Sequence, residues 1–293
     1  MAGSRSVSAP DIAGSKGGDP LVMVTAYDAP SARAVDAAGV DMILVGDSVA
    51  MVVLGYDDTL HVTIDDMAHH TAAVARTGPD ALLVADLPWM SYHLGRDDTV
   101  ANAARLVRAG AQAVKLEGGR KRVDAVRAIL DAEIPVMGHI GLTPQSVNAF
   151  GGFKVQGKTL DGARAIVDDA LALAEAGVFA IVLECVPDAV ARMVTDAVPV
   201  PTIGIGAGRH CDGQVLVFHD LLGFEDRVQP RFVRRYASML DDATTAIGRF
   251  AADVRAGRFP ASSETYHAAD GVTDALGLDD VDATAVPVTA GRA

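Results

Sequence analysis

Three short apolar runs of the sequence each carry a carboxylate near their C-terminal end. The runs are 42–48, 81–88 and 113–119, and their carboxylates are Asp47, Asp86 and Glu117. Runs of this kind are typical of buried parallel strands, and neighbouring strands lie only about 4.8 Å apart. Three consecutive strands would therefore bring three carboxylates to one edge. Lys115 stands two residues before Glu117, so both side chains lie on the same strand face.

The charge of this group predicts a bound cation. Three carboxylates and one lysine leave an excess of two negative charges, and like charges about 4 Å apart repel by roughly 4 kcal/mol at an effective dielectric near 20. A divalent ion relieves that repulsion, and an all-oxygen ligand set suits Mg²⁺ better than Zn²⁺. We therefore expect Asp47, Asp86 and Glu117 to be metal ligands. The alternative is that they are helix caps or solvated loop residues.

Two further polar residues interrupt apolar runs. Glu184 lies between Leu183 and Cys185 in the run 180–186. Burial raises the pKa of a carboxyl group and suits it to accepting a proton, so Glu184 is a candidate catalytic base; a buried ion pair with an arginine is the alternative. His139 is either a pocket residue or a core histidine with satisfied hydrogen bonds.

Eight apolar runs predict the fold. They span 21–28, 42–48, 81–88, 113–119, 135–142, 180–186, 201–208 and 215–223. Ala-rich amphipathic stretches such as 100–110 and 163–177 separate most of them, which is the pattern of βα units. We predict a single-domain α/β protein of the (β/α)₈ TIM-barrel type, whose chemistry lies at the C-terminal strand ends. A doubly wound open sheet is the alternative.

Three connections depart from an ideal barrel, and one of them is the long segment 49–66 after the second strand. Residues 209–214 leave no room for a helix between the last two strands. Residues 143–159, which contain Lys154 and Lys158, form a long loop that is either a lid or plain surface. The glycines of 204–208 could cradle a phosphate or allow close backbone packing.

Composition sets the domain limits. We expect a flexible leader at 1–19, a catalytic barrel with C-terminal helices at 20–267 (helical from 224 to about 257), and an acidic, disordered tail at 268–293.

Composition also argues against several classes of protein. The net charge of −13 argues against a nucleic-acid partner. No apolar run reaches the roughly 18 residues of a membrane span, and no signal peptide precedes the barrel. Two cysteines give no disulfide framework, which predicts a reducing, cytoplasmic location.

Ten motifs occur in the order of a known family. They are TAYD (25–28), LVGDS (44–48), TLHVT (59–63), ADLP (85–88), VKLEGG (114–119), GHIGLTPQS (138–146), FGGFKVQGK (150–158), LECVP (183–187), IGIGAG (203–208) and DGQVLVFHD (212–220). Together they make residues 20–267 resemble the ketopantoate hydroxymethyltransferase family. Ala50, Trp89 and the segment 209–214 depart from its usual pattern.

The resemblance implies an activity and its site. It implies a Mg²⁺-dependent barrel that uses 5,10-methylenetetrahydrofolate and the small molecule 3-methyl-2-oxobutanoate to make 2-dehydropantoate for pantothenate and coenzyme A synthesis. The family's residues map onto this chain as metal ligands Asp47, Asp86 and Glu117, substrate contacts Asp47, Ser48, Asp86 and Lys115, and proton acceptor Glu184.

The resemblance also implies a homo-oligomer, commonly a decamer. Two other functions stay open on the residues alone. One is an enzyme of the isocitrate lyase and phosphoenolpyruvate mutase group, which acts on 2-oxo acids without folate. The other is a non-catalytic barrel that binds a regulatory ligand.

The charged residues are unusually biased, and this predicts salt adaptation. The chain has 32 Asp against 6 Glu, and 20 Arg against 5 Lys. Because salt shortens the screening length from about 30 Å at 0.01 M to about 3 Å at 1 M, the self-repulsion of such a chain fades as salt rises. We expect the thermal unfolding midpoint to rise between about 0.1 M and about 3 M KCl. A flat midpoint, with full activity at low salt, would favour codon bias as the cause.

Overall fold

The computed structural model describes residues 6–224, 229–269 and 271–277. The chain divides into two compact units, Met1–Tyr236 and Ala237–Ala293. Among the described residues, no helix is both long enough and apolar enough to cross a membrane.

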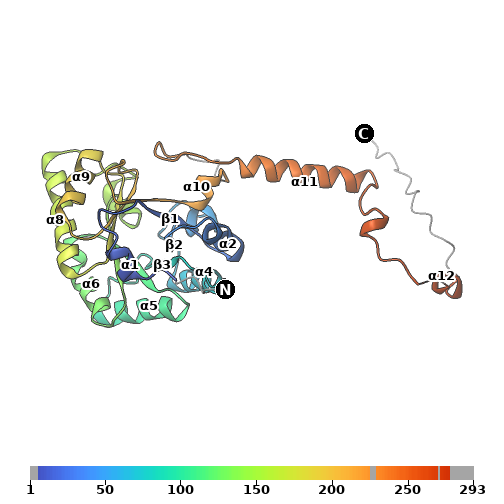
Figure 1. Cartoon of the computed structure of the whole chain (residues 1–293), viewed down its shortest axis with the longest axis horizontal. Helices are drawn as coiled ribbons and strands as arrows, with labels where there is room; N and C mark the ends of the chain where they lie inside the picture. The colour runs from blue at the N-terminus through green and yellow to red at the C-terminus, as the bar shows by residue number, and fades with distance from the viewer. Residues whose placement is uncertain (1–5, 225–228, 270, 278–293) are drawn as a thin grey trace. The chain divides into compact units, whose positions relative to one another are not determined.

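The first unit is built on a closed sheet of eight parallel strands (Figure 1). The strands are β1 (Leu21–Thr25), β2 (Met42–Val45), β3 (Leu82–Asp86), β4 (Ala113–Glu117), β5 (Val136–Gly141), β6 (Ala180–Glu184), β7 (Thr202–Ile205) and β8 (Gly213–Leu216). Each strand pairs with the next, and β8 returns to β1 through the register Leu21 to Gly213. The predicted barrel is confirmed, and the open sheet is excluded.

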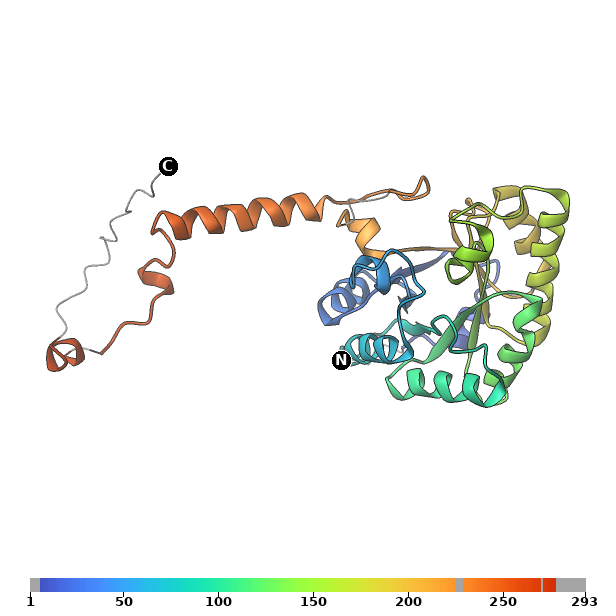
Figure 2. The ribbon, with the colours of Figure 1, turned by 180° about the vertical axis from the view of Figure 1, so that it is seen from behind.

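Helices form the outer layer of this unit (Figures 1 and 2). The longer ones are α2 (Ala29–Ala37), α4 (Ile64–Ala75), α5 (Arg96–Arg108), α6 (Val123–Leu130), α8 (Leu160–Ala176) and α9 (Asp188–Ala197). The short ones are α3 (Val49–Val52), α7 (Val147–Phe150), α10 (Phe218–Leu222) and the 3₁₀ turns η1 (Arg120–Arg122) and η2 (Pro144–Ser146). Between β7 and β8 the connection contains no helix, as its length predicted.

Local sequence sets where these helices begin. At α4, the Thr63 hydroxyl accepts a hydrogen bond from the Asp66 N–H, and the Asp66 carboxylate accepts one from the Thr63 N–H at 2.9 Å. Asp28 and Ser31 form the same reciprocal pair at α2. Such boxes satisfy backbone donors that would otherwise lack partners at a helix start, so each helix begins at a fixed residue after its strand.

The alternation of side chains along the strands positions the functional groups. On β3, Leu82 and Val84 belong to the core cluster that fills the barrel, whereas Leu83 and Ala85 belong to the cluster beneath the helices. Because strand side chains alternate between faces, the next inward position after Val84 is Asp86. The same two-residue period also directs four other side chains into the barrel: Lys115 and Glu117 on β4, His139 on β5 and Glu184 on β6.

The leader contributes a helix to the barrel core. Within residues 1–19, α1 (Ala9–Ala13) buries Ala9 and Ile12 against the cluster inside the barrel. Lys16 forms an ion pair of 2.9 Å with Asp212, whose carboxylate also accepts the backbone N–H of Gly17 and of Thr202. The described part of the leader is therefore tied to the turn that enters β8.

Two element boundaries differ from the sequence prediction. The last strand was expected at 215–223, but β8 ends at Leu216 and α10 occupies Phe218–Leu222. A helix was expected from 224, but α11 (Met239–Arg255) begins at 239. In both places the prediction followed the apolar residues and overlooked a residue that ends regular structure. Gly223 ends α10 with a φ of 71°, and Pro230 precedes a non-helical segment. In the second unit, η3 (Ser262–Glu264) and α12 (Val272–Ala275) follow α11. The rest of the expected tail, 270 and 278–293, lies outside the described residues.

Candidate active site

A cluster of charged side chains is buried at the C-terminal strand ends. The side chains of Asp47, Asp86, Lys115, Glu117 and His139 expose 5% or less of their surface. They come from β3, β4, β5 and the turn after β2, and the neighbouring strands are in register, with Asp86 opposite Lys115 and Glu117 opposite His139. The convergence predicted from strand-end positions is what the barrel produces.

Lys115 is the cation at the centre of this cluster. Its ammonium lies 2.9 Å from Asp86 Oδ1 and 3.2 Å from His139 Nδ1. Burial acts to lower the pKa of Lys115, but the carboxylates of Asp86, Glu117 and Asp47 outweigh burial and raise that pKa above its ordinary value. Lys115 therefore stays charged and cannot serve as a free amine nucleophile at neutral pH.

His139 connects Lys115 to Glu184. Burial, and then the charge of Lys115, hold the pKa of His139 well below its ordinary value, so the ring is neutral. An ammonium has only donors, so Nδ1 must accept from Lys115 and the ring proton resides on Nε2. Nε2 lies 3.2 Å from Glu184 Oε2. No arginine among the described residues pairs with Glu184, so the sequence alternative of a buried arginine pair is not what the structure has.

Glu184 has the properties of a proton acceptor. Burial raises its pKa to about 7, although Lys115 acts to lower it. A carboxyl group with a pKa near the working pH takes up and releases protons efficiently. The next residue, Cys185, has a φ of 47°, which is strained for a side chain of this kind. Burial raises the pKa of the Cys185 thiol to about 12, so Cys185 is a packing residue and not a nucleophile.

Gln145 joins the carboxylates and was missed by the sequence analysis. Its side-chain amide donates to Asp47 Oδ2 at 2.8 Å, and its backbone N–H donates to Glu117 Oε2 at 3.0 Å. Its amide oxygen accepts the Tyr92 hydroxyl at 2.6 Å. The available signal was its place in η2, directly after β5, where barrel enzymes carry site residues.

Ser48 follows Asp47 in the turn after β2. Its hydroxyl is 2.8 Å from the Tyr27 hydroxyl. The backbone N–H of Asp47 donates to Asp86 Oδ2 at 3.0 Å, which holds the turn after β2 against β3. A Cβ at Gly46 would lie 2.9 Å from Ser48 Oγ and 3.5 Å from Asp86 Oδ2, so Ser48 and Asp86 face the same small space.

Protonation reports how much negative charge this site holds. Burial first, and the charge of Asp86 second, raise the pKa of Asp47 to about 7. Burial, followed by the charge of Asp47, raises the pKa of Glu117 well above its ordinary value. In the absence of another cation, bound protons therefore neutralise Asp47 and Glu117.

A divalent cation fits this site in a restricted way. Among the described residues, no group of three or more His, Cys, Asp or Glu side chains is arranged to enclose a metal ion. Asp86 Oδ1 is buried, and among the described residues it has the Lys115 ammonium at 2.9 Å but no well-oriented hydrogen bond. Mg²⁺ usually keeps several waters and takes only one or two carboxylates directly. The site fits that mode, with the remaining acids acting through water.

The two Gly-rich segments play different roles. The glycines of 204–208 pack closely: a Cβ at Gly206 would lie 2.8 Å from Phe232, and one at Gly208 would lie 2.6 Å from Asp188. Close packing, not a phosphate cradle, therefore accounts for them. The loop 143–159 reaches the site through Gln145 and through Gln156, whose N–H donates to the Cys185 carbonyl at 3.0 Å.

Comparison with known proteins gives a consistent result. The family model described as ketopantoate hydroxymethyltransferase matches residues 6–262. A protein of Syntrophomonas wolfei named 3-methyl-2-oxobutanoate hydroxymethyltransferase is 56% identical, with 87% of this chain and 93% of that protein covered. Its namesake from Moorella thermoacetica is 57% identical, with 85% and 93% covered.

Solved structures share the fold at much lower identity. A phosphonopyruvate hydrolase superposes with a TM-score of 0.57 at 14% identity and covers 92% of this chain and 95% of its own. A 2,3-dimethylmalate lyase of the phosphoenolpyruvate mutase and isocitrate lyase superfamily has a TM-score of 0.56 at 17% identity, with 89% and 92% covered.

The raised pKa values predict proton release on cation binding. Because the folded pKa of Asp47 is raised to about 7, Mg²⁺ that displaces its proton should release protons near pH 6 and few at pH 8. The same shift means that the metal-free protein loses unfolding free energy as pH rises from about 4 to about 7. Calorimetry in buffers of different ionisation enthalpy measures the release. Asp47→Asn should reduce it, and the exposed control Asp161→Asn should not; Mg²⁺ binding without proton release near pH 6 would contradict this account.

Proposed function

Because the chain belongs to the ketopantoate hydroxymethyltransferase family, we propose that it transfers a hydroxymethyl group from 5,10-methylenetetrahydrofolate to 3-methyl-2-oxobutanoate, giving 2-dehydropantoate. The single observation that carries this proposal is the pairing of Glu184 with Lys115 across the neutral His139. A base with a pKa of about 7 and a fixed ammonium stand on opposite sides of one buried histidine. This is the equipment for removing a proton next to a carbonyl and holding the charge that develops.

The substrate's charged end belongs beside Lys115. The substrate carries a carboxylate and a 2-oxo group, and Lys115 is the buried cation of the site. Ser48, which shares a small space with Asp86, supplies a hydroxyl donor to the same end. A bound Mg²⁺, held by Asp47, Asp86 and Glu117 directly or through water, would polarise the 2-oxo group as a Lewis acid.

Glu184 performs the proton transfer. It removes the C3 hydrogen as a proton, and the electron pair of that C–H bond becomes the new C–C bond to the one-carbon unit. Over the whole reaction both C–N bonds of the folate's methylene bridge break, one water supplies the hydroxyl oxygen and the two protons that tetrahydrofolate gains on leaving, and the proton taken from C3 ends on that hydroxyl. His139 Nε2 lies 3.2 Å from Glu184 Oε2 without the geometry of a hydrogen bond, so it is a close electrostatic contact of the carboxylate. Lys115 offsets the negative charge that builds on the 2-oxo oxygen. Its ammonium is buried, so water does not screen its charge.

The two alternatives are less well supported. The likeness to a phosphonopyruvate hydrolase and a dimethylmalate lyase, at 14% and 17% identity, concerns the fold alone. A regulatory barrel would not need Glu184 near neutral pKa beside four charged groups. Activity with formaldehyde in the absence of any folate binding would favour the first alternative, and complete lack of turnover would favour the second.

We place the protein in the cytoplasm as a homo-oligomer. Cys185 and Cys211 are both free, which supports a reducing compartment. In the second unit, α11 has no buried residue, and its large apolar side chains Ile247, Phe250 and Val254 lie at the spacing of one helix face. An exposed apolar helix face of this kind supports contact with another subunit.

The base is tested by hydrogen exchange. Without folate, wild-type enzyme should exchange the substrate C3 hydrogen for deuterium, at a rate that rises as pH rises through about 7, because the ionised Glu184 is the base. Glu184→Gln should lower that rate by about 10²-fold or more while substrate still binds. The exposed control Glu175→Gln should exchange normally. Wild-type exchange in Glu184→Gln would refute the assignment, and borohydride trapping of substrate on Lys115 would favour a Schiff base instead.

The oligomer is tested on α11. Ile247→Asp combined with Phe250→Asp should lower the molar mass measured by light scattering, because charge would enter an apolar contact. Thr245→Asp, on the opposite face of the same helix, is the matched control and should keep the wild-type mass. A wild-type mass in the double variant would remove α11 from the contact.

A further inference from the structure

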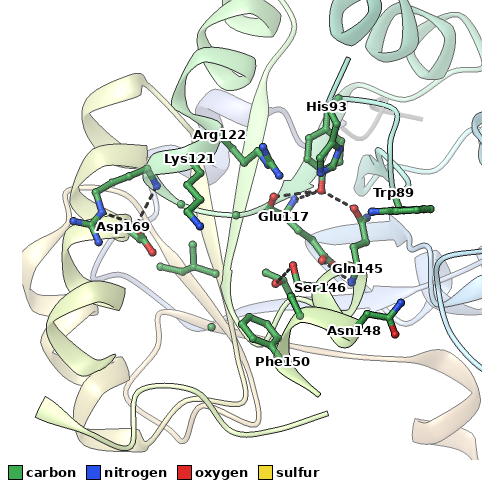
Figure 3. Close-up of a pocket in the computed structure, with 18 of the residues that line it drawn as sticks. Trp89, His93, Glu117, Lys121, Arg122, Gln145, Ser146, Asn148, Phe150 and Asp169 are labelled. Atoms are coloured by element: carbon green, nitrogen blue, oxygen red, sulfur yellow. Dashed lines mark hydrogen bonds and ion pairs between the residues drawn. The ribbon is translucent and has the colours of Figure 1, made fainter. Parts of the chain in front are cut away.

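A cavity adjoins the buried cluster at the C-terminal face of the barrel. Its volume is about 760 Å³, within the range of small-molecule sites. It is lined by the segments that follow β2, β3, β4 and β5, and it shares Glu117 and Gln145 with the active site (Figure 3). A ligand in this cavity would therefore touch the residues that border the reacting centre.

The cavity wall carries three consecutive basic residues in a protein of net charge −13. They are Arg120, Lys121 and Arg122 of η1. Arg120 is already neutralised, because it pairs with Asp169 at 2.8 Å and Asp168 at 3.3 Å. Over the part of the chain that the structure describes, Lys121 and Arg122 form no such pair. Two cations therefore remain available to an anionic ligand.

The backbone before these residues holds them in place. Gly118 has a φ of 116°, and a Cβ there would lie 2.7 Å from Arg122 Cγ, so the Arg122 stem lies against bare backbone. The Arg122 guanidinium stands 5.8 Å from the centroid of the Tyr92 ring. A Cβ at Gly119 would clash with Asp169 at 2.2 Å, so this glycine allows the Arg120 pair to form. The backbone of this turn therefore fixes the positions of the Arg120 and Arg122 side chains.

The rest of the wall suits a flat ring system. Trp89 is 43% exposed and Phe150 lies below Glu117 in Figure 3, with Lys121 and Trp89 on opposite sides. The His93 ring lies against the Tyr92 ring with centroids 4.4 Å apart and an interplanar angle of 39°, and its buried Nδ1 has no hydrogen-bond partner in the described chain. The cavity thus offers aromatic faces, the His93 Nδ1 nitrogen and, among the described residues, two cations without a carboxylate partner.

We propose that this cavity binds the folate co-substrate, with Lys121 and Arg122 binding the carboxylates of its glutamate tail. The proposal rests on the function proposed above. A folate combines a flat pterin, an aminobenzoyl ring and a tail with at least two carboxylates, which matches the aromatic wall and the cation pair. The shared border at Glu117 and Gln145 brings the carbon-bearing end of the pterin to the substrate. Each added glutamate brings another carboxylate, so polyglutamate forms should bind more tightly.

Binding is measured directly with tetrahydrofolate, in its monoglutamate and triglutamate forms, by calorimetry. Because Trp89 is the single tryptophan of the chain, quenching of its emission locates the ligand in this cavity. We expect Lys121→Ala with Arg122→Ala to weaken binding of the monoglutamate by tenfold or more and to abolish the preference for the triglutamate. Arg127→Ala, which removes one positive charge from an exposed position of α6 outside the cavity, should bind both forms as wild type does.

Two further measurements separate the outcomes. Inorganic phosphate and glutarate test a bare anion site: if they compete with the monoglutamate as well as the triglutamate does, the cations bind anions in general and the proposal is overturned. Exchange of the substrate C3 hydrogen needs no folate, so it reports on the barrel site alone. If exchange falls in the double variant as much as transfer does, or if both folate forms bind it as wild type, the proposal also fails. Absence of exchange and of product in the wild type would instead overturn the proposed function.

Discussion

The structure of the site depends on one constraint, which is an excess of negative charge held in a closed barrel. Asp47, Asp86 and Glu117 are buried around a single ammonium, that of Lys115. Water cannot screen these charges at the strand ends, so each one changes the protonation of the next. Burial is the first cause of the raised pKa values of Asp47 and Glu117 and of the lowered pKa of His139, and the charges of the neighbouring groups are the second.

The neutral histidine keeps the acid and base functions apart. His139 does not take up a second proton, because the resulting imidazolium would lie 3.2 Å from the Lys115 ammonium, and two cations at that distance in a buried site repel strongly. His139 therefore presents a lone pair to Lys115 and a proton toward Glu184. A protonated histidine would lower the pKa of Glu184 by its charge and weaken it as a base. In the proposed mechanism, the position of one proton on His139 thus decides whether Glu184 can accept a proton near neutral pH.

Much of this arrangement could be predicted from sequence, because it follows from periodicity. Runs of buried residues gave eight strands, and the two-residue period of a strand put Asp86, Lys115 and Glu117 inside the barrel. Gln145 could not be found in this way, because its contacts join residues 28 and 98 positions away and depend on the conformation of a loop. The boundary of β8 was misplaced because apolar residues continue into α10, where the period changes without a polar break. The role of residues 120–122 was not visible either, since only the contacts of Asp168 and Asp169 distinguish Arg120 from its neighbours.

The charge balance also bears on how the proposed substrate and the proposed cation would bind. A 2-oxo acid is itself an anion, so it would add a negative charge to a site where Lys115 is already outnumbered. Protons on Asp47 and Glu117 can compensate, but a proton is fixed to one oxygen and cannot contact the substrate carboxylate and the carbonyl together. A divalent cation can do both, because its water ligands are replaceable and its charge acts on every oxygen around it. Binding of the cation and binding of the substrate should therefore reinforce each other, and by linkage the coupling is equal in the two directions. The cation that we propose follows in this reading from the burial of the acids, since the same acids in a solvated loop would leave the substrate anion little reason to require one.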